Sequence, residues 1–142
     1  MATLTGTLFQ VFAENKHEVA MFGSNTLKVA LTNTEPTAAT DDEFADITEL
    51  GDGHGYTTGG EEVSYTSGQA SGTFTVEASA NVSWTASGGT IGPFQYIVLY
   101  DDTTTGDKLV CYWSRASAYT IEDGSTYTLS INGSTLYSDA PA

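Results

Sequence analysis

Residues Trp84 to Trp113, with the sequence WTASGGTIGPFQYIVLYDDTTTGDKLVCYW, decide the fold. Their longest apolar run, Phe94 to Tyr100, is aromatic and β-branched in character, which predicts a strand buried on both faces. The polar segment Asp101 to Asp107 contains Gly106 and predicts a hairpin loop longer than two residues. Lys108 to Trp113 is the returning strand, with apolar side chains on both of its faces. We expect this hairpin at the centre of a sheet that is covered on each side.

Short segments outside this hairpin alternate between apolar and polar residues and end at Gly, Asn or Asp. Such a pattern is typical of strands joined by turns. It predicts an all-β fold, an antiparallel β-sandwich or jelly roll of about eight to ten short strands with one short helix. Besides the hairpin, the predicted strands lie within residues 3–14, 19–22, 26–32, 63–66, 72–77, 81–85, 118–121, 125–131 and 135–137.

One segment has helical character. Thr40 can cap a first turn, and Glu43, three residues later, completes a capping box. Phe44, Ile47 and Leu50 then follow at helical spacing. We therefore expect the one short helix here.

The glycine-rich segment Gly51 to Gly60 directly follows this helix. A phosphate-binding loop needs a Lys at its end, or a strand before it and a helix after it. Here the order of helix and strand is reversed and Lys is absent. We interpret the segment as a structural loop whose glycines adopt positive φ angles.

The length and composition indicate one ordinary domain. A chain of 142 residues fits a single β-sandwich domain, residues 1–142, in which residues 1–14 include an N-terminal arm. The single cysteine, Cys111, excludes an internal disulfide and is expected to be a small buried apolar residue. No segment approaches the roughly 18 apolar residues of a membrane span, and no secretory signal is visible.

The net charge of −14, from 18 acidic and four basic residues, excludes two classes of partner. Phosphate groups of nucleic acids and anionic lipids are bound through several Lys or Arg side chains. Only Lys16, Lys28, Lys108 and Arg115 are present. We expect neither nucleic acid nor membrane as a partner, and a basic protein surface or bound cations fit better.

Two acidic clusters are candidate calcium ligands: Asp41, Asp42, Glu43 and Asp46, and Asp101, Asp102 and Asp107. Calcium takes six to eight oxygen ligands, and neither cluster has the Asp-x-Asp-x-Asp-Gly order of a calcium loop. We interpret both as solvated loops and a helix start, with one weak cation site as the alternative.

Motifs for metal binding or catalysis are absent from the sequence. His17 and His54 are far apart, and neither Cys-x-x-Cys nor His-x-x-x-His occurs. The Gly-x-Ser-x-Gly turn of serine hydrolases is also missing. We predict no catalytic residues, no cofactor, no metal site and no enzymatic activity.

Exposed aromatic side chains can stack on sugars, which leaves a carbohydrate platform as an alternative. Trp84 and Trp113 alternate with polar neighbours as core residues do. Tyrosines are the better candidates for the platform: Tyr56, Tyr65, Tyr119 and Tyr137.

Several motifs, in this order, resemble a group of small virion proteins of tailed bacteriophages, the capsid decoration or cement proteins. They are Leu27–Asn33 (LKVALTN), Phe44–Thr48 (FADIT), Gly55–Gly60 (GYTTGG), Val82–Trp84 (VSW), Phe94–Thr103 (FQYIVLYDDT) and Lys108–Trp113 (KLVCYW). The likeness covers roughly residues 26 to 131. Similar chains often continue with Asp-Phe-Gly, where this chain has Ser114-Arg115-Ala116, and the first 25 residues match nothing comparable.

The resemblance implies a virion protein, made in the host cytoplasm, that sits on the outer capsid surface. It implies binding to the major capsid protein, homotrimer formation and stabilisation of the assembled head. A tail-tube or head-fibre component is the alternative within the same class, and a module for carbohydrate or host-surface binding is the alternative outside it. Residues Thr3 to Phe12 are a candidate arm that adds a strand to a neighbour.

Overall fold

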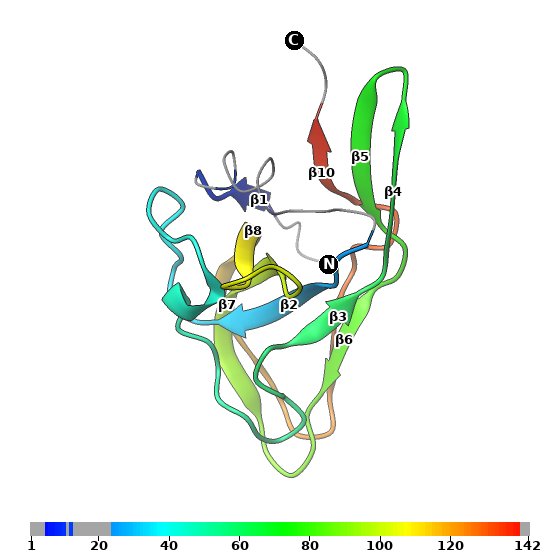
Figure 1. Cartoon of the computed structure of the whole chain (residues 1–142). Helices are drawn as coiled ribbons and strands as arrows, with labels where there is room; N and C mark the ends of the chain where they lie inside the picture. Colours follow the sequence, from blue (N-terminus) through cyan, green and yellow to red (C-terminus); the bar gives the residue numbers. More distant parts are fainter. Residues whose placement is uncertain (1–4, 11, 13–23, 140–142) are drawn as a thin grey trace.

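The computed structural model describes residues 5–10, 12 and 24–139, and these form ten β-strands (Figure 1). The strands are β1 (Thr5–Leu8), β2 (Leu27–Thr32), β3 (Glu61–Val63), β4 (Tyr65–Ala70), β5 (Thr73–Ala78), β6 (Val82–Thr85), β7 (Ile91–Asp101), β8 (Lys108–Ile121), β9 (Thr126–Leu129) and β10 (Thr135–Asp139). All of their pairings are antiparallel.

The strands divide into three sheets. The largest has the order β1-β8-β7-β2-β3, the second β10-β5-β4, and the third pairs β6 with β9. Figure 1 shows the long β4–β5 hairpin, with β10 beside it, extending away from the sheet that contains β2, β7 and β8. The all-β prediction is confirmed. The finer prediction of a sandwich or jelly roll stays a prediction.

The predicted hairpin is the centre of the largest sheet. Strand β7 lies between β8 and β2, and its residues Ile97, Val98, Leu99 and Tyr100 are at most 1% exposed. Successive strand residues point to opposite faces, so both faces of β7 are covered, as the apolar run predicted. Burying each such side chain stabilises the fold by roughly 1.5–3 kcal/mol relative to leaving it in water.

The predicted helix is reduced to a single 3-10 turn, Phe44–Asp46. Its N-cap is Glu43 rather than Thr40, and the capping box joins Glu43 to Asp46. The flanking backbone is engaged elsewhere: the Leu50 N–H donates to the Leu31 carbonyl at 3.0 Å. Extended pairing with β2 and β8 therefore overrides the local helical spacing.

Several predicted strand boundaries also differ. Strand β8 continues without interruption to Ile121, where the sequence suggested two strands, and residues 63–66 belong to two strands, β3 and β4. Thr5–Leu8, inside the predicted arm, pairs with β8 of its own chain. The remainder of that arm and the predicted strand at 19–22 fall largely outside the described residues. No helix in the described part of the chain is long and apolar enough to cross a membrane.

Candidate functional site

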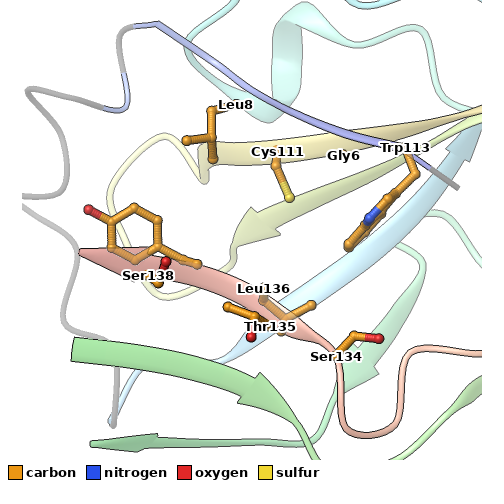
Figure 2. Close-up of a pocket in the computed structure, with 9 residues that line it drawn as sticks. Gly6, Leu8, Cys111, Trp113, Ser134, Thr135, Leu136 and Ser138 are labelled. Atoms are coloured by element: carbon orange, nitrogen blue, oxygen red, sulfur yellow. The ribbon is translucent and has the colours of Figure 1, made fainter. Parts of the chain in front are cut away.

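A groove of about 460 Å³ separates the β1–β8 edge from β10 (Figure 2). Figure 2 shows Leu8, Cys111 and Trp113 on one wall, with Leu136 and Thr135 on the other. Leu8 is 50% exposed, whereas Leu136 is 6% exposed. One wall comes from β1 and β8 of the largest sheet, and the other from β10 and residue Ser134 just before it.

The register of β1 on β8 builds the first wall. Gly6 pairs with Trp113 and Leu8 pairs with Cys111, so these four residues share one face of the sheet. A Cβ atom on Gly6 would lie 3.3 Å from the Trp113 Nε1, a tight contact. The missing side chain at Gly6 therefore leaves room for the indole ring beside the groove.

Cys111 supplies no reactive group to this groove. The residue is 4% exposed, and burial raises the pKa of its thiol to about 12. A thiol with so high a pKa is not a nucleophile at neutral pH. The prediction of a small buried apolar residue is confirmed.

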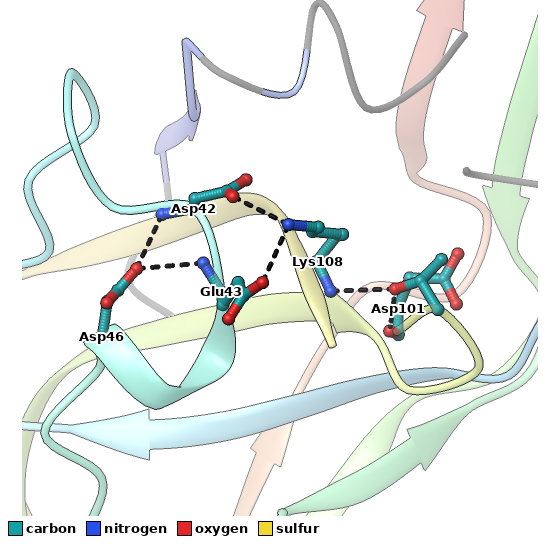
Figure 3. Close-up of polar contacts among 6 residues, drawn as sticks. Asp42, Glu43, Asp46, Asp101 and Lys108 are labelled. Atoms are coloured by element: carbon teal, nitrogen blue, oxygen red, sulfur yellow. Dashed lines mark hydrogen bonds and ion pairs between the residues drawn. The ribbon is translucent and has the colours of Figure 1, made fainter. Parts of the chain in front are cut away.

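The first acidic cluster surrounds Lys108 (Figure 3). The Lys108 Nζ donates to Asp42 Oδ2 at 2.8 Å and to Glu43 Oε1 at 2.9 Å. Asp46 accepts from the backbone N–H groups of Asp42 and Glu43, and these bonds lower its pKa. Hydrogen bonds to the two carboxylates raise the pKa of Lys108. Since these oxygens bind an ammonium and backbone donors, the cluster ties the 3-10 turn to β8.

In the second acidic cluster, Asp101 and Asp102 likewise bind protein donors. Asp101 accepts from the Asn25 side chain at 2.8 Å and from the Thr103 N–H at 3.1 Å. Asp102 pairs with Lys28 at 3.2 Å. Within residues 5–10, 12 and 24–139, no three His, Cys, Asp or Glu side chains are placed to hold a metal ion. His17 lies outside these residues.

The glycine-rich loop is held by a partly buried polar cluster. The Tyr56 hydroxyl donates to Glu49 Oε2 at 2.5 Å and accepts from the Leu31 N–H at 3.0 Å. Glu49 also accepts from the Gly59 N–H at 2.7 Å, and the Tyr100 hydroxyl donates to the Gly59 carbonyl. Four glycines of the loop have positive φ angles, as predicted: Gly53, Gly55, Gly59 and Gly60. The cluster is structural, because each polar atom binds the loop or β2.

No family model, curated protein or solved structure matches this chain. Its function is therefore inferred from the geometry and from the resemblance of its motifs.

The four candidate tyrosines of a carbohydrate platform differ in how far the structure exposes them. Tyr56 and Tyr137 are buried, at 3% and 8% exposed, so neither offers a ring face to a sugar. The hydroxyl of Tyr65, which is partly buried, donates to the Asn25 carbonyl. Tyr119, at 37% exposed, is the most accessible of the four, and the Arg115 guanidinium lies 4.8 Å from its ring centre.

The tryptophans also differ from one another. Trp84 is 1% exposed, as predicted, whereas Trp113 is partly exposed and borders the groove. The sequence pattern missed the groove because alternation places Trp113 on a face without showing what covers that face. In the sequence, only the apolar Leu8 at the end of the alternating segment Thr5–Leu8 could have indicated a contact surface here.

Proposed function

We propose that this chain is a non-enzymatic structural protein of a bacteriophage virion that decorates the outer surface of the assembled head. Five of the six motifs that carry the resemblance form β2, β7 and the start of β8, together with the 3-10 turn and part of the glycine-rich loop that contact them, whereas the sixth, Val82–Trp84, lies in β6 of the two-stranded sheet. Most of the likeness therefore involves neighbouring parts of the structure rather than scattered segments. The major capsid protein is the proposed partner.

The groove beside β1 is the observation that carries the proposal. Strand β1 is an uncharged edge strand, so its outer backbone groups can pair with a strand of a capsid subunit. Leu8 is half exposed next to the groove, and its side chain can be buried by such a contact. An edge strand beside a groove with both polar and apolar lining fits a polypeptide better than a small substrate.

Co-sedimentation with heads of the encoding phage, before and after expansion, tests the proposal. We expect saturable binding at a fixed ratio to capsid subunits, on expanded heads only. Absence of binding to both forms would reject decoration and direct attention to tail tubes and head fibres.

Leu8→Asp is the matched variant for the proposed contact. Deletion of residues 2–12 is a poorer test, because Phe9 and Phe12 are 1% and 2% exposed and belong to the core. Loss of a buried Leu contact is worth about 1.5–3 kcal/mol, which weakens binding about tenfold to a hundredfold. Ser117→Asp, at an exposed position of β8, adds the same charge and should bind like wild type.

A carbohydrate-binding function is the second candidate, and the exposed Tyr119 beside Arg115 favours it. A stacked guanidinium and an exposed aromatic ring suit a sugar that carries a carboxylate. Glycan-array binding that is lost in Tyr119→Ala would support this function. Wild-type head binding by the same variant would separate it from decoration.

A further inference from the structure

We propose that the outer edge of β4 is a self-association site, at which two copies of the chain pair antiparallel around Ser67 to join their β10-β5-β4 sheets. The inference rests on β4 alone and is independent of head binding. A two-fold pair also differs from the trimer that the resemblance implies.

The geometry of the β4–β5 hairpin determines which backbone groups face outward. Its two-residue turn, Ser71 and Gly72, has φ angles of 51° and 83°, and Ala70 pairs with Thr73 directly beside it. In such hairpins the residues that flank the turn exchange hydrogen bonds, and bonded and non-bonded pairs then alternate along the ladder.

This alternation assigns the backbone groups along β4. Gly68 and Thr66 face β5, as Ala70 does, whereas Gln69 and Ser67 face outward. The bond from the Ser79 N–H to the Ser64 carbonyl, 2.9 Å long, continues the same alternation. Within the described residues no strand pairs with β4 on that side. The N–H and C=O groups of Ser67 and Gln69 are therefore directed toward a partner strand.

Strand β4 combines a lack of charge, Pro and bulges with a length that the other described edge strands do not reach. Edge strands are normally guarded by charged side chains, Pro, bulges or short length. Strand β3, for example, is three residues long and carries Glu61 and Glu62. Strand β4 is the longest described edge strand at six residues, has no charged residue or Pro, and pairs with β5 without a bulge.

Charge favours a second copy as the occupant. Residues 65–78 of the hairpin contain one charged residue, Glu77, in a chain of net charge −14. Pairing around Ser67 places Glu77 of each copy on the far strands of a four-strand arrangement, about three strand spacings of ~4.8 Å apart. That separation exceeds a Debye length of about 8 Å at physiological salt, so mutual repulsion is weak. The hairpin extends away from the body, which keeps the acidic surfaces apart (Figure 1).

Sedimentation equilibrium of the full chain over a wide range of concentrations tests the pairing. We expect the wild-type mass to rise with concentration toward twice the 15.0 kDa of one chain. Ser67→Glu places two like charges beside the two-fold axis and should weaken the dimer at least tenfold. Ser67→Lys should do the same, and an equimolar mixture of the two variants should restore the dimer through opposite charges.

Ser117→Glu, at an exposed position of β8, is the control and should dimerise like wild type. Circular dichroism shows whether each variant is folded. A wild-type mass of one chain at every concentration overturns the proposal, as does a dimer or trimer that Ser67→Glu leaves unchanged. A monomeric wild type whose head binding falls in Ser67→Glu would assign this edge to a capsid strand, which also overturns self-pairing.

Discussion

At the residue scale, Gly60 has the least room for a side chain. Its φ angle is +76°, and a Cβ atom there would lie 1.8 Å from the Val29 carbonyl oxygen. Both the left-handed backbone and this contact with β2 exclude a side chain. The glycine-rich loop is therefore fixed to the sheet by close backbone approach as well as by the Tyr56 and Tyr100 hydroxyls.

We predict that Gly60→Ala lowers the free energy of unfolding by about 3 kcal/mol or more, because the backbone of the loop or of β2 must shift. Gly51→Ala is the matched control, since a Cβ atom at Gly51 meets nothing within 4 Å, and it should change stability by about 0.5 kcal/mol or less. Urea denaturation measures both. Equal effects of the two substitutions would contradict the proposed close contact.

Glu49 makes the stability of the fold depend on pH. Burial raises the pKa of its carboxyl above the usual 4.5, although the Tyr56 hydroxyl and the Gly59 N–H oppose the shift. The folded chain therefore binds this proton more tightly than the unfolded chain, and the stabilisation is fully present below pH 4.5. It is lost as the pH rises through the folded pKa.

We predict that Glu49→Gln removes this pH dependence. The unfolding free energy of the variant minus that of wild type should become more positive as the pH rises from about 4 to 7, by about 1 kcal/mol at most, because partial exposure screens the charge. Urea denaturation of both proteins at several pH values measures the difference. A difference that stays constant, or that falls with pH, would show that Glu49 keeps its usual pKa.

At the element scale, the turn of the β4–β5 hairpin is not the best one for its geometry. Ser71 and Gly72 both have positive φ angles, which is the arrangement of a type I′ turn. Asn at the first position tolerates this conformation better than Ser. We predict that Ser71→Asn stabilises the chain by about 0.5 kcal/mol, as a higher midpoint of thermal unfolding. Ser71→Val should destabilise it, and an unchanged or lower midpoint for Asn would contradict the turn assignment.

Among the elements, the β7–β8 hairpin was predicted well from the sequence and the short helix was not. The β7–β8 hairpin was predictable because seven consecutive residues favour a strand and a glycine-containing loop follows them. The helix predicted between Thr40 and Leu50 was wrong, because the conformation of this segment depends on contacts with backbone that is distant in the sequence. The Phe44 N–H donates to the Asp107 carbonyl at 2.9 Å, and the Phe44 ring stacks on Tyr100 at 4.1 Å. Tertiary contacts of this kind leave no periodic trace in the local sequence.

The groove and the position of β4 at the edge of the described sheet could not be predicted from the sequence, for a related reason. Both depend on which strands are neighbours: β10 pairs with β5 rather than with β1, which leaves the groove between them. Alternation assigns each side chain to a face of a strand but does not order the strands. The sequence therefore predicted Leu8 only as a strand residue and Trp113 only as a core residue. The structure shows that both border the same groove.

At the scale of the whole molecule, charge repulsion is the main unfavourable electrostatic interaction. The chain has 18 acidic and four basic residues, and two of the three described cations are already paired, Lys28 with Asp102 and Lys108 with Asp42 and Glu43. Such surface pairs contribute about 0–1 kcal/mol each, whereas a net charge of −14 destabilises every compact state through self-repulsion. Added salt weakens both effects, and repulsion is the larger.

We therefore predict that sodium chloride stabilises the fold, raising the free energy of unfolding by about 1–2 kcal/mol between roughly 0.01 and 0.5 M as the Debye length falls from about 30 Å to below 8 Å. Chloride is the proper probe, because sulfate also strengthens apolar burial. Lys108→Met is the matched variant: it removes the pairs to Asp42 and Glu43 and raises the net negative charge, so its stability should rise more steeply with salt than that of wild type. A wild-type stability that falls with salt would mean that the few ion pairs outweigh the repulsion among the carboxylates, and that the acidic surface does not limit the fold.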